Sequence, residues 1–221
     1  MKHGLVIACG GIGSRLYKSI PKQFVLIKNK PLLFWTLKNI LKFKFNEIVV
    51  TYPRGYKLHT EDICKNFENI LLVEGGKRRQ DSVRNAVNCL KSSDVLFIHD
   101  GVRPFVNKRL INSLLKSIGD NSGIIPVLKI PETVKEICSD RTTKTIDRKN
   151  LYLIQTPQVF YLKHYLKVLD KVDFSIEYTD DAQMFEMLGE SIATIEGLRY
   201  NIKITYDEDI ILAEKLLEIF I

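Results

Sequence analysis

The chain has 221 residues, 45% of them hydrophobic, which is enough for one α/β domain with a full core. Its formal net charge of +7 favours an anionic partner. The sequence has no apolar run as long as the roughly 18 residues of a membrane span, no basic stripe with interleaved aromatics, and no Cys-x-x-Cys pair. We therefore expect no membrane segment, no nucleic-acid partner, and neither a zinc site nor a disulfide framework. The N-terminus enters an apolar run by residue 5, which predicts a cytoplasmic protein without a signal or transit peptide.

Apolar runs alternate with amphipathic segments along the chain, a succession typical of βαβ units and a mainly parallel sheet. The predicted strands cover residues 5–9, 47–51, 70–74, 95–99, 123–127 and 191–196. The predicted helices cover residues 32–42, 56–66, 82–90, 108–118, 163–171, 180–188 and 207–219. In the last helix, Asp207 or Asp209 near the N-terminus suits the helix dipole. We expect a single Rossmann-like α/β domain over residues 1–221, with helices flanking the sheet.

One segment departs from this alternation. Residues 133–148 alternate polar and apolar side chains around the polar turn Ser139-Asp140-Arg141, which predicts a β-hairpin that projects from the core as an arm of about residues 131–150. An isolated hairpin is marginally stable in water, so we expect the arm to pack on something.

A glycine-rich turn follows the first apolar run and carries two cations. Gly10, Gly11 and Gly13 precede Arg15, and Lys22 follows in a Pro-Lys-Gln triplet. Glycines let backbone N–H groups approach phosphate oxygens, and the cations supply the positive charge that phosphate needs. The turn lacks the Lys-Ser/Thr pair of a P-loop and the third glycine of a dinucleotide fingerprint. The remaining pattern indicates nucleotidyl transfer.

Five segments in order resemble the sugar-phosphate nucleotidyltransferases and, within them, the 2-C-methyl-D-erythritol 4-phosphate cytidylyltransferase family. Each segment is weak alone, but the five together span nearly the whole chain. They are Gly10-Gly11-Ile12-Gly13-Ser14-Arg15 with Pro21-Lys22-Gln23, Gly75-Gly76 through Arg79-Gln80-Asp81-Ser82-Val83, His99-Asp100-Gly101-Val102-Arg103-Pro104, Thr145-Ile146-Asp147-Arg148 with Gln155-Thr156-Pro157-Gln158, and Asn201-Ile202-Lys203-Ile204-Thr205.

The resemblance implies transfer of CMP from CTP to 2-C-methyl-D-erythritol 4-phosphate, with release of pyrophosphate, in the non-mevalonate route to isoprenoid precursors. It also implies a homodimer that exchanges the arm, and Mg²⁺ held mostly by the CTP phosphates, with Asp100 as the candidate protein ligand. A phosphate monoester is mostly dianionic near pH 7, its second pKa being about 6, so the reaction needs no general base. We expect cation clamps and positioning to do most of the catalytic work.

The same resemblance assigns roles to individual residues. The implied catalytic residues are Arg15, Lys22, Arg148 and Lys203. The implied nucleotide-binding residues are Gly10, Gly11, Gly13, Gly76, Arg79, Ser82 and Asp100. The implied substrate-binding residues are Gly101, Arg103, Arg148, Thr156 and Lys203, with Arg148 reaching the substrate from the neighbouring subunit.

The chain departs from the family pattern at two positions. Lys77 stands where the family usually has an acidic residue, which puts a ribose contact there in question, and Gly101 stands where alanine is common. The turn Thr179-Asp180-Asp181 resembles a family turn that closes the site, and a helix N-cap explains it equally well.

Several of these residues have structural alternatives. Ser82 suits the N-cap of the helix expected at 82–90, and Asp100 suits a cap on the turn that follows it. Lys203 lies on an alternating segment, where a solvent-facing lysine is the simpler expectation. His99 is expected to be a hydrogen-bonded residue at a strand end, neither acid nor base.

Two other functions stay open on the sequence alone. D-ribitol-5-phosphate cytidylyltransferase shares the glycine-rich turn, and the segment 99–105 slightly favours it, whereas the segments 145–148 and 179–181 favour the methylerythritol enzyme. A non-catalytic nucleotide-binding module is the rival of another class. It predicts loss of the clamp cations, yet they are all present.

Overall fold

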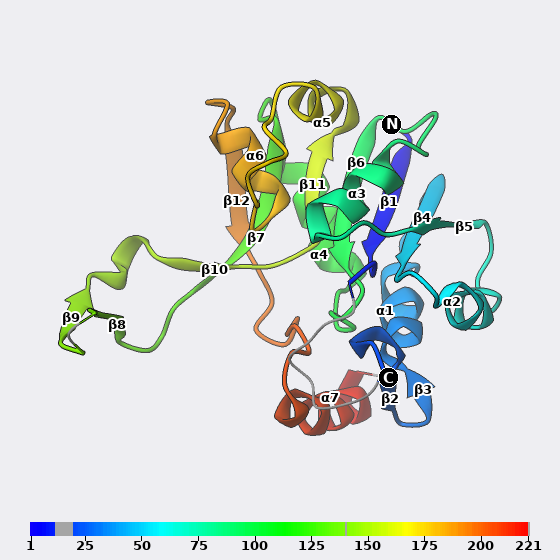
Figure 1. Cartoon of the computed structure of the whole chain (residues 1–221), viewed down its shortest axis with the longest axis horizontal. Helices are drawn as coiled ribbons and strands as arrows, with labels where there is room; N and C mark the ends of the chain where they lie inside the picture. The colour runs from blue at the N-terminus through cyan, green and yellow to red at the C-terminus, as the bar shows by residue number, and fades with distance from the viewer. Residues whose placement is uncertain (12–19, 140, 221) are drawn as a thin grey trace.

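A central sheet dominates the computed structural model, which describes residues 1–11, 20–139 and 141–220 (Figure 1). Within those residues the sheet has eight strands, in the order β10-β7-β11-β6-β1-β4-β5, with β12 paired to β7. The strands are β1 (His3–Ala8), β4 (Glu47–Tyr52), β5 (Ile70–Glu74), β6 (Val95–Asp100), β7 (Gly123–Lys129), β10 (Tyr152–Ile154), β11 (Gln158–Tyr161) and β12 (Ile192–Glu196).

The strand directions divide the sheet into two parts. β6, β1, β4 and β5 run parallel, and β12 runs parallel to β7. β11 lies antiparallel between β6 and β7, and β10 is antiparallel to β7. The predicted α/β class and the six predicted strands are confirmed. β10 and β11 were missed, because each is only three or four residues long and no helix separates them in the chain.

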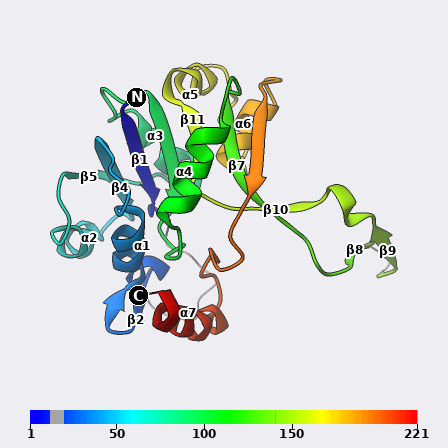
Figure 2. The ribbon, with the colours of Figure 1, turned by 180° about the vertical axis from the view of Figure 1, so that it is seen from behind.

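Helices cover both faces of the sheet (Figure 2). Their bounds are α1 (Leu32–Ile40), α2 (Lys57–Cys64), α3 (Arg79–Val87), α4 (Lys108–Ser117), α5 (Leu162–Leu169), α6 (Asp181–Glu186) and α7 (Asp207–Phe220). The side chains of β1 alternate between the faces, as a strand requires. Leu5 and Ile7 pack with α1, α2 and α4, whereas Val6 packs with α3, α5 and α6. All seven predicted helices are present, with ends that differ from the prediction by at most three residues. Within the described residues, no helix is long and apolar enough to cross a bilayer.

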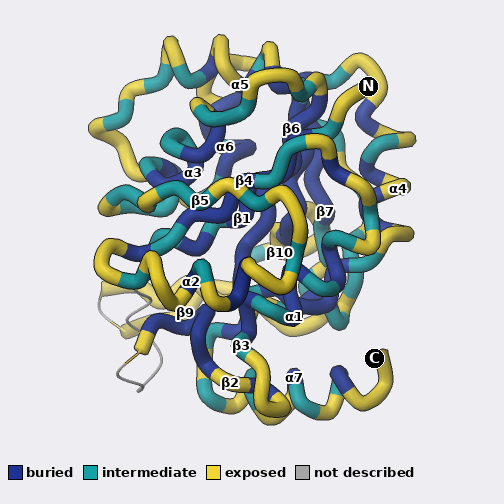
Figure 3. Tube along the Cα trace, turned by 90° about the vertical axis from the view of Figure 1, so that its right-hand side faces the viewer, coloured by how far each residue is buried: buried dark blue, intermediate teal, exposed yellow. Residues whose placement is uncertain are grey.

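The core lies along the central strands, which Figure 3 shows as the buried middle of the molecule. Every residue of β6 is buried. A strand buried on both faces reads as a continuous apolar run, and β6 departs from that pattern only at its last two residues, His99 and Asp100. These two polar groups therefore need partners inside the protein.

A third apolar cluster holds the C-terminal helix against α1 and a small two-stranded sheet. The short strands β2 (Leu26–Ile27) and β3 (Lys30–Pro31) pack with α1 and α7, and Trp35 donates from Nε1 to the Ile27 carbonyl at 2.8 Å. Ile204 joins this cluster, and its N–H donates to the Val102 carbonyl at 3.0 Å. Asp209 accepts two backbone N–H bonds at the start of α7, as expected for an acidic residue there. Residues 201–205 are thus anchored without forming a strand.

The predicted arm is present and projects away from the sheet (Figure 1). β8 (Val134–Ile137) pairs antiparallel with β9 (Thr143–Ile146), and the short 3-10 helix η2 (Arg148–Asn150) follows. Most side chains of the hairpin are exposed, so little apolar area is buried within this chain to stabilise it.

Candidate active site

The functional side chains gather at the edge of the sheet where β1, β4, β5 and β6 end. β1 and β6 pair in register with Ala8 beside Asp100, so the glycine-rich turn begins next to the end of β6. Ligands of open α/β sheets bind outside the carboxyl ends of the strands. The chain therefore places its two most informative motifs together at the expected edge.

Close packing explains why this edge is rich in glycine. A Cβ atom on Gly10 would lie 2.4 Å from Ser82 Oγ, and one on Gly76 would lie 2.3 Å from the Cβ of Asp81. Real Cβ atoms do not approach so closely, so a side chain at either position forces the turn apart. Glycine is therefore required at both positions by packing against α3.

Ser82 joins these turns to α3, but not as its N-cap. α3 begins at Arg79, and its cap is a reciprocal pair in which Arg78 and Asp81 bond each other. Ser82 Oγ instead accepts from the Gly76 N–H at 3.0 Å and donates to the Arg78 carbonyl at 3.1 Å. The predicted N-cap role was wrong because the helix starts three residues before the predicted first residue.

Asp100 is the centre of the site. Its Oδ1 lies 3.3 Å from Arg79 Nε, and its Oδ2 lies 3.3 Å from Arg103 Nε and 3.0 Å from Lys203 Nζ. Two cations from distant parts of the sequence, Arg79 and Lys203, therefore join the nearby Arg103 on one buried carboxylate. The alternative role of Asp100 as a turn cap does not hold for its side chain, whose two oxygens bond these cations.

The electrostatics follow from this convergence. Burial alone would raise the pKa of Asp100, but the charges of Arg79, Lys203 and Arg103 outweigh it and hold the pKa well below its usual range. Burial likewise acts to lower the pKa of Arg79, and the carboxylates of Asp181 and Asp100 raise it far above its usual value. Asp100 and Arg79 are therefore both charged at neutral pH.

His99 and Thr156 hold the end of β6 through a chain of hydrogen bonds. The Asp100 N–H donates to Thr156 Oγ1 at 3.1 Å, which lies 3.0 Å from His99 Nδ1. His99 Nε2 lies 3.0 Å from the Arg103 carbonyl, and a carbonyl only accepts, so Nε2 carries the proton and Nδ1 accepts. Burial lowers the pKa of His99 to about 4. His99 is thus a neutral, hydrogen-bonded residue at a strand end, as predicted.

Backbone contacts position Arg103 and Lys203. Arg103 Nη1 donates to the Asn201 carbonyl at 2.9 Å, and Asn201 Nδ2 donates to the Thr156 carbonyl at 2.8 Å. Gln155 Nε2 also donates to the Asn201 carbonyl, at 3.1 Å. Lys203 therefore lies on an anchored loop with its side chain about half-exposed, turned to Asp100. The alternative of a purely solvent-facing lysine on a strand was wrong.

The described part of the glycine-rich turn connects to the same loop. Lys22 is buried in the short 3-10 helix η1 (Lys22–Phe24), and its Nζ donates to the Thr205 carbonyl at 3.0 Å. Gln23 Nε2 donates to the carbonyls of Cys9 and Gly11, at 2.7 and 3.1 Å. Gly13 and Arg15 lie outside the described residues, so their predicted roles stay predictions.

Two cavities adjoin these elements. One of about 590 Å³ has Arg79, Asp100, Arg103, Thr156 and Lys203 in its wall. A larger one of about 930 Å³ lies at the base of the arm, against β7, β10 and β12. The smaller cavity contains Asp100 and the three cations paired with it, so we take it as the candidate active site.

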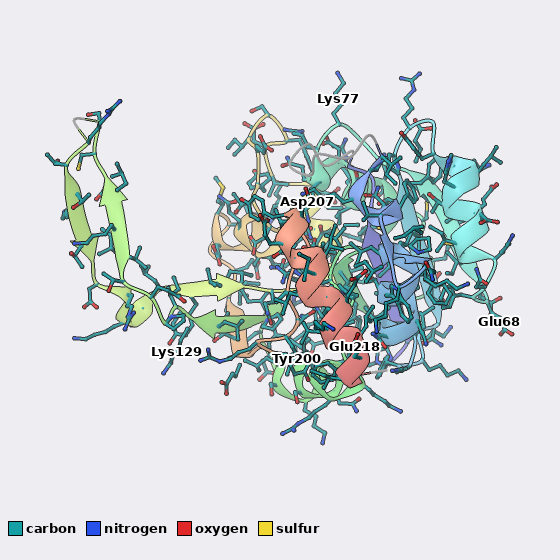
Figure 4. The ribbon with its side chains drawn as sticks, turned by 90° about the horizontal axis from the view of Figure 1, so that it is seen from below. Glu68, Lys77, Lys129, Tyr200, Asp207 and Glu218 are labelled. Atoms are coloured by element: carbon teal, nitrogen blue, oxygen red, sulfur yellow. The ribbon has the colours of Figure 1, made fainter. Side chains whose placement is uncertain are left out.

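Two predicted features lie elsewhere. Arg148 is exposed at the base of the arm, where its Nη1 donates to the Pro131 carbonyl, and it is absent from the lining of the smaller cavity as described. Lys77 is exposed and points away from the body of the molecule (Figure 4). Neither side chain contributes to the Asp100 cluster within this chain.

The described side chains do not form a metal site by themselves. They contain no group of three or more His, Cys, Asp or Glu residues suited to a metal ion. Both oxygens of Asp100 face cations, whereas Mg²⁺ needs free oxygen ligands. This donor set does not fit a Mg²⁺ ion held by the protein alone.

Comparison with known proteins identifies the family. A family model for 2-C-methyl-D-erythritol 4-phosphate cytidylyltransferase matches residues 4–219. The chain belongs to this family. The curated cytidylyltransferase of Syntrophus aciditrophicus is 35% identical over 96% of this chain and 94% of its own length. That of Clostridium perfringens is 36% identical over 95% of this chain and 96% of its own length.

Solved structures agree with this assignment. The 4-diphosphocytidyl-2C-methyl-D-erythritol synthase of Anaerococcus prevotii superposes with a TM-score of 0.84 at 29% identity, covering 98% of this chain and 97% of that one. The cytidylyltransferase of Thermus thermophilus gives a TM-score of 0.82 at 29% identity, covering 99% and 100%. This chain is therefore a CTP-dependent cytidylyltransferase of isoprenoid precursor synthesis, and the methylerythritol interpretation of the sequence is confirmed.

Sequence reasoning missed some members of the site. Asp181 contacts Arg79 from α6, and Asn201 links Arg103 to Thr156. Both residues stand inside or beside the quoted motifs, so the sequence marked them as candidates. It did not predict their partners, because those partners lie about 45 to 102 residues away in the chain. Asp180 is an N-cap, of α6, as the structural alternative predicted.

Proposed function

We propose that the cavity beside Asp100 is where this cytidylyltransferase brings the phosphate of 2-C-methyl-D-erythritol 4-phosphate to the triphosphate of CTP. The observation that carries the proposal is the convergence of Arg79, Arg103 and Lys203 on one buried carboxylate. The cavity wall holds three cations, and its carboxylates are Asp100, Asp180 and Glu186, with Asp181 paired to Arg79 behind it. Lys203 is the most exposed of these cations, and so the one best placed to meet a phosphate.

The proposed step is a displacement at phosphorus. A phosphate oxygen of the acceptor attacks the α-phosphorus of CTP while the bond to the bridging oxygen breaks, and pyrophosphate leaves with that electron pair. The acceptor is already mostly dianionic near pH 7, so no base is required. His99 is neutral and uses both ring nitrogens in hydrogen bonds, which agrees with a role in structure. Stabilisation by fixed cations supplies the catalysis.

Each predicted site residue takes a place in this proposal. Arg79 is revised: its guanidinium is bonded to two carboxylates, so it acts on the substrates through Asp100. The residues proposed to hold the nucleotide are Gly10, Gly11, Gly13, Arg15, Lys22, Gly76 and Ser82. The residues proposed to hold the acceptor are Gly101, Arg103, Thr156 and Lys203 of this chain and Arg148 of the partner subunit.

The proposal also covers the oligomeric state, the metal ion and the location of the enzyme. The projecting arm and the exposed position of Arg148 support a homodimer in which each arm completes the other subunit's site. Mg²⁺ is proposed to accompany CTP, with phosphates and water as its main ligands. We propose a cytoplasmic location, where CTP is available.

The test is pyrophosphate release from CTP and Mg²⁺, measured with 2-C-methyl-D-erythritol 4-phosphate and D-ribitol 5-phosphate in parallel. We expect release with the first acceptor only. Lys203→Ala should reduce the rate by about 100-fold, whereas Lys116→Ala, an exposed lysine of α4, should leave it unchanged. Release with ribitol phosphate alone would contradict the proposed acceptor. Full activity of Lys203→Ala would contradict the proposed site.

A further inference from the structure

Asp181 is a buried carboxylate that the proposed reaction does not use directly. It is the first residue of α6 and is 1% exposed. Asp180 already caps this helix, since its Oδ1 accepts from the Gln183 N–H at 3.0 Å. The carboxylate of Asp181 is therefore not needed for capping, and its burial requires another explanation.

Both oxygens of Asp181 have partners in the site. Oδ1 accepts from the Tyr165 hydroxyl at 2.7 Å, and Oδ2 accepts from Arg79 Nη1 at 2.6 Å. The Nε of Arg79 then reaches Asp100, whose other oxygen meets Lys203. A continuous chain of polar contacts thus runs from a fully buried tyrosine to the half-exposed lysine of the cavity.

The Tyr165 end of this chain is fixed. Tyr165 is fully buried in the core between the sheet and α6, and it packs against Phe160 and Phe185. Burial and the nearby charge of Asp181 raise the pKa of Tyr165 well above its usual value. Its hydroxyl therefore keeps its proton and remains a donor to Asp181 at any pH at which the enzyme is assayed.

Neighbouring segments hold Asp181 from two further directions. Gln158 of β11 accepts the backbone N–H of Asp181 at 3.1 Å through Oε1. The loop before α6 is tied to α3, because Gln80 bonds the Ile176 carbonyl at 2.8 Å and the Tyr178 N–H at 2.8 Å. The position of this carboxylate is thus set by the same helix that carries Arg79.

We propose that Asp181 is a positioning residue, which holds the guanidinium of Arg79 so that only its Nε reaches Asp100 and Asp100 keeps an oxygen for Lys203. The inference rests on the proposed placement of the substrate phosphates at Lys203. Without the Asp181 charge, Arg79 is drawn wholly to Asp100 and displaces Lys203 from it. Lys203 then still attracts anions but no longer has one defined place.

This role has a kinetic signature that a purely structural role lacks. In Asp181→Asn the cavity gains one positive charge, so the binding of anionic substrates is not weakened. The misplaced Lys203 lowers kcat, because stabilisation of the transition state depends on geometry more than binding does. We expect kcat to fall about 10-fold or more, with KM for both substrates unchanged or lower.

The experiment measures kcat, KM and urea unfolding for Asp181→Asn, Asp181→Glu and Tyr165→Phe, all as full-length enzyme. Asp181→Glu restores the carboxylate and should recover much of kcat. Tyr165→Phe removes one contact of Asp181 and should lower kcat severalfold. Asp120→Asn makes the same charge change at an exposed turn and should match the wild type.

The outcomes distinguish failure of the positioning role from failure of the proposed function. A wild-type enzyme without pyrophosphate release overturns the proposed function, whatever the variants do. With an active wild type, a folded Asp181→Asn whose kcat stays within about twofold overturns the positioning role. So does a rise in KM at constant kcat. If Asp181→Asn does not fold, Tyr165→Phe decides: an unchanged kcat in that variant overturns the inference.

Discussion

The Asp100 cluster and the projecting arm both carry cations that sequence motifs marked as functional, yet they are built in opposite ways. The cluster lies at the end of a buried strand, and every one of its charges has a partner within the chain. The arm is a two-stranded hairpin with mostly exposed side chains, and Arg148 at its base donates to the backbone carbonyl of Pro131.

The two regions differ in what fixes the positions of their side chains. Burial makes the charges of the cluster depend on one another, so each side chain has one favourable position. A water-exposed hairpin with little buried area receives no such constraint from its own chain. We therefore expect Arg148, unlike the cluster, to gain a defined position only from a surface outside this chain.

The largest expected effect tests whether Arg148 works from the partner subunit. Arg148→Ala and Lys203→Ala should each lose activity by about 100-fold or more. When the two variants are mixed and allowed to exchange subunits, one site of each heterodimer has an intact Lys203 and an intact arm. Activity should then return in about half of the heterodimer sites.

The measurement is pyrophosphate release before and after mixing, at constant total protein. Each variant alone, taken through the same exchange, is the control. If activity does not recover although subunit exchange is demonstrated, Arg148 acts within its own chain. The proposed contrast between the two regions would then not hold.

A second prediction concerns the buried histidine of the cluster. The pKa of His99 is lowered from 6.5 in the unfolded chain to about 4 in the folded protein. Between pH 4 and 6.5 the imidazole is therefore protonated in the unfolded chain and neutral in the folded protein. Stability from this group is complete above pH 6.5 and is lost as the pH falls toward 4, by about 3 kcal/mol in total.

Urea unfolding at several pH values checks this window. His99→Gln should be less stable at neutral pH but should lose less stability than the wild type between pH 6.5 and 4. His59→Gln, at an exposed position of α2, should follow the wild-type curve. Parallel curves for His99→Gln and wild type would show that this histidine does not couple folding to pH.

The smallest expected effect compares packing in the two regions. A Cβ on Gly101 would lie 1.8 Å from Cys9 Sγ, so the Cys9 thiol occupies the space of an alanine methyl at 101. Gly101→Ala should destabilise the fold by about 1–3 kcal/mol. Cys9→Ala should remove much of that cost in the double variant.

The matched change in the arm is Lys135→Ala, which removes an exposed bond to Thr145. It should alter the free energy of unfolding by less than about 0.5 kcal/mol. Additive effects of the Cys9 and Gly101 changes would mean that the two residues do not compete for one space. An effect of Lys135→Ala as large as that of Gly101→Ala would mean that the arm is packed as tightly as the core.

Much of the fold was predictable because local pattern and tertiary structure agree. The six predicted strands and seven predicted helices rest on apolar periodicity, which burial in a two-faced α/β core enforces. The same holds for the hairpin, whose alternation and polar turn are local signals. β11 was missed because it is only four residues long and its place in the sheet, between β6 and β7, is not marked by any local sequence pattern. The start of α3 was missed because its cap is an arginine paired with Asp81, an unusual cap.

The sequence by itself determined the family, the reaction class and the residue types that phosphate chemistry requires, since these depend on motifs read along the chain. Only the tertiary structure decided which distant charges meet: Arg79 and Lys203 at Asp100, beside the nearby Arg103, and Asp181 behind Arg79. Contacts between residues far apart in the chain follow from how strands and helices pack, and no local pattern encodes them. Burial then makes those contacts obligatory, because a charge removed from water needs a partner.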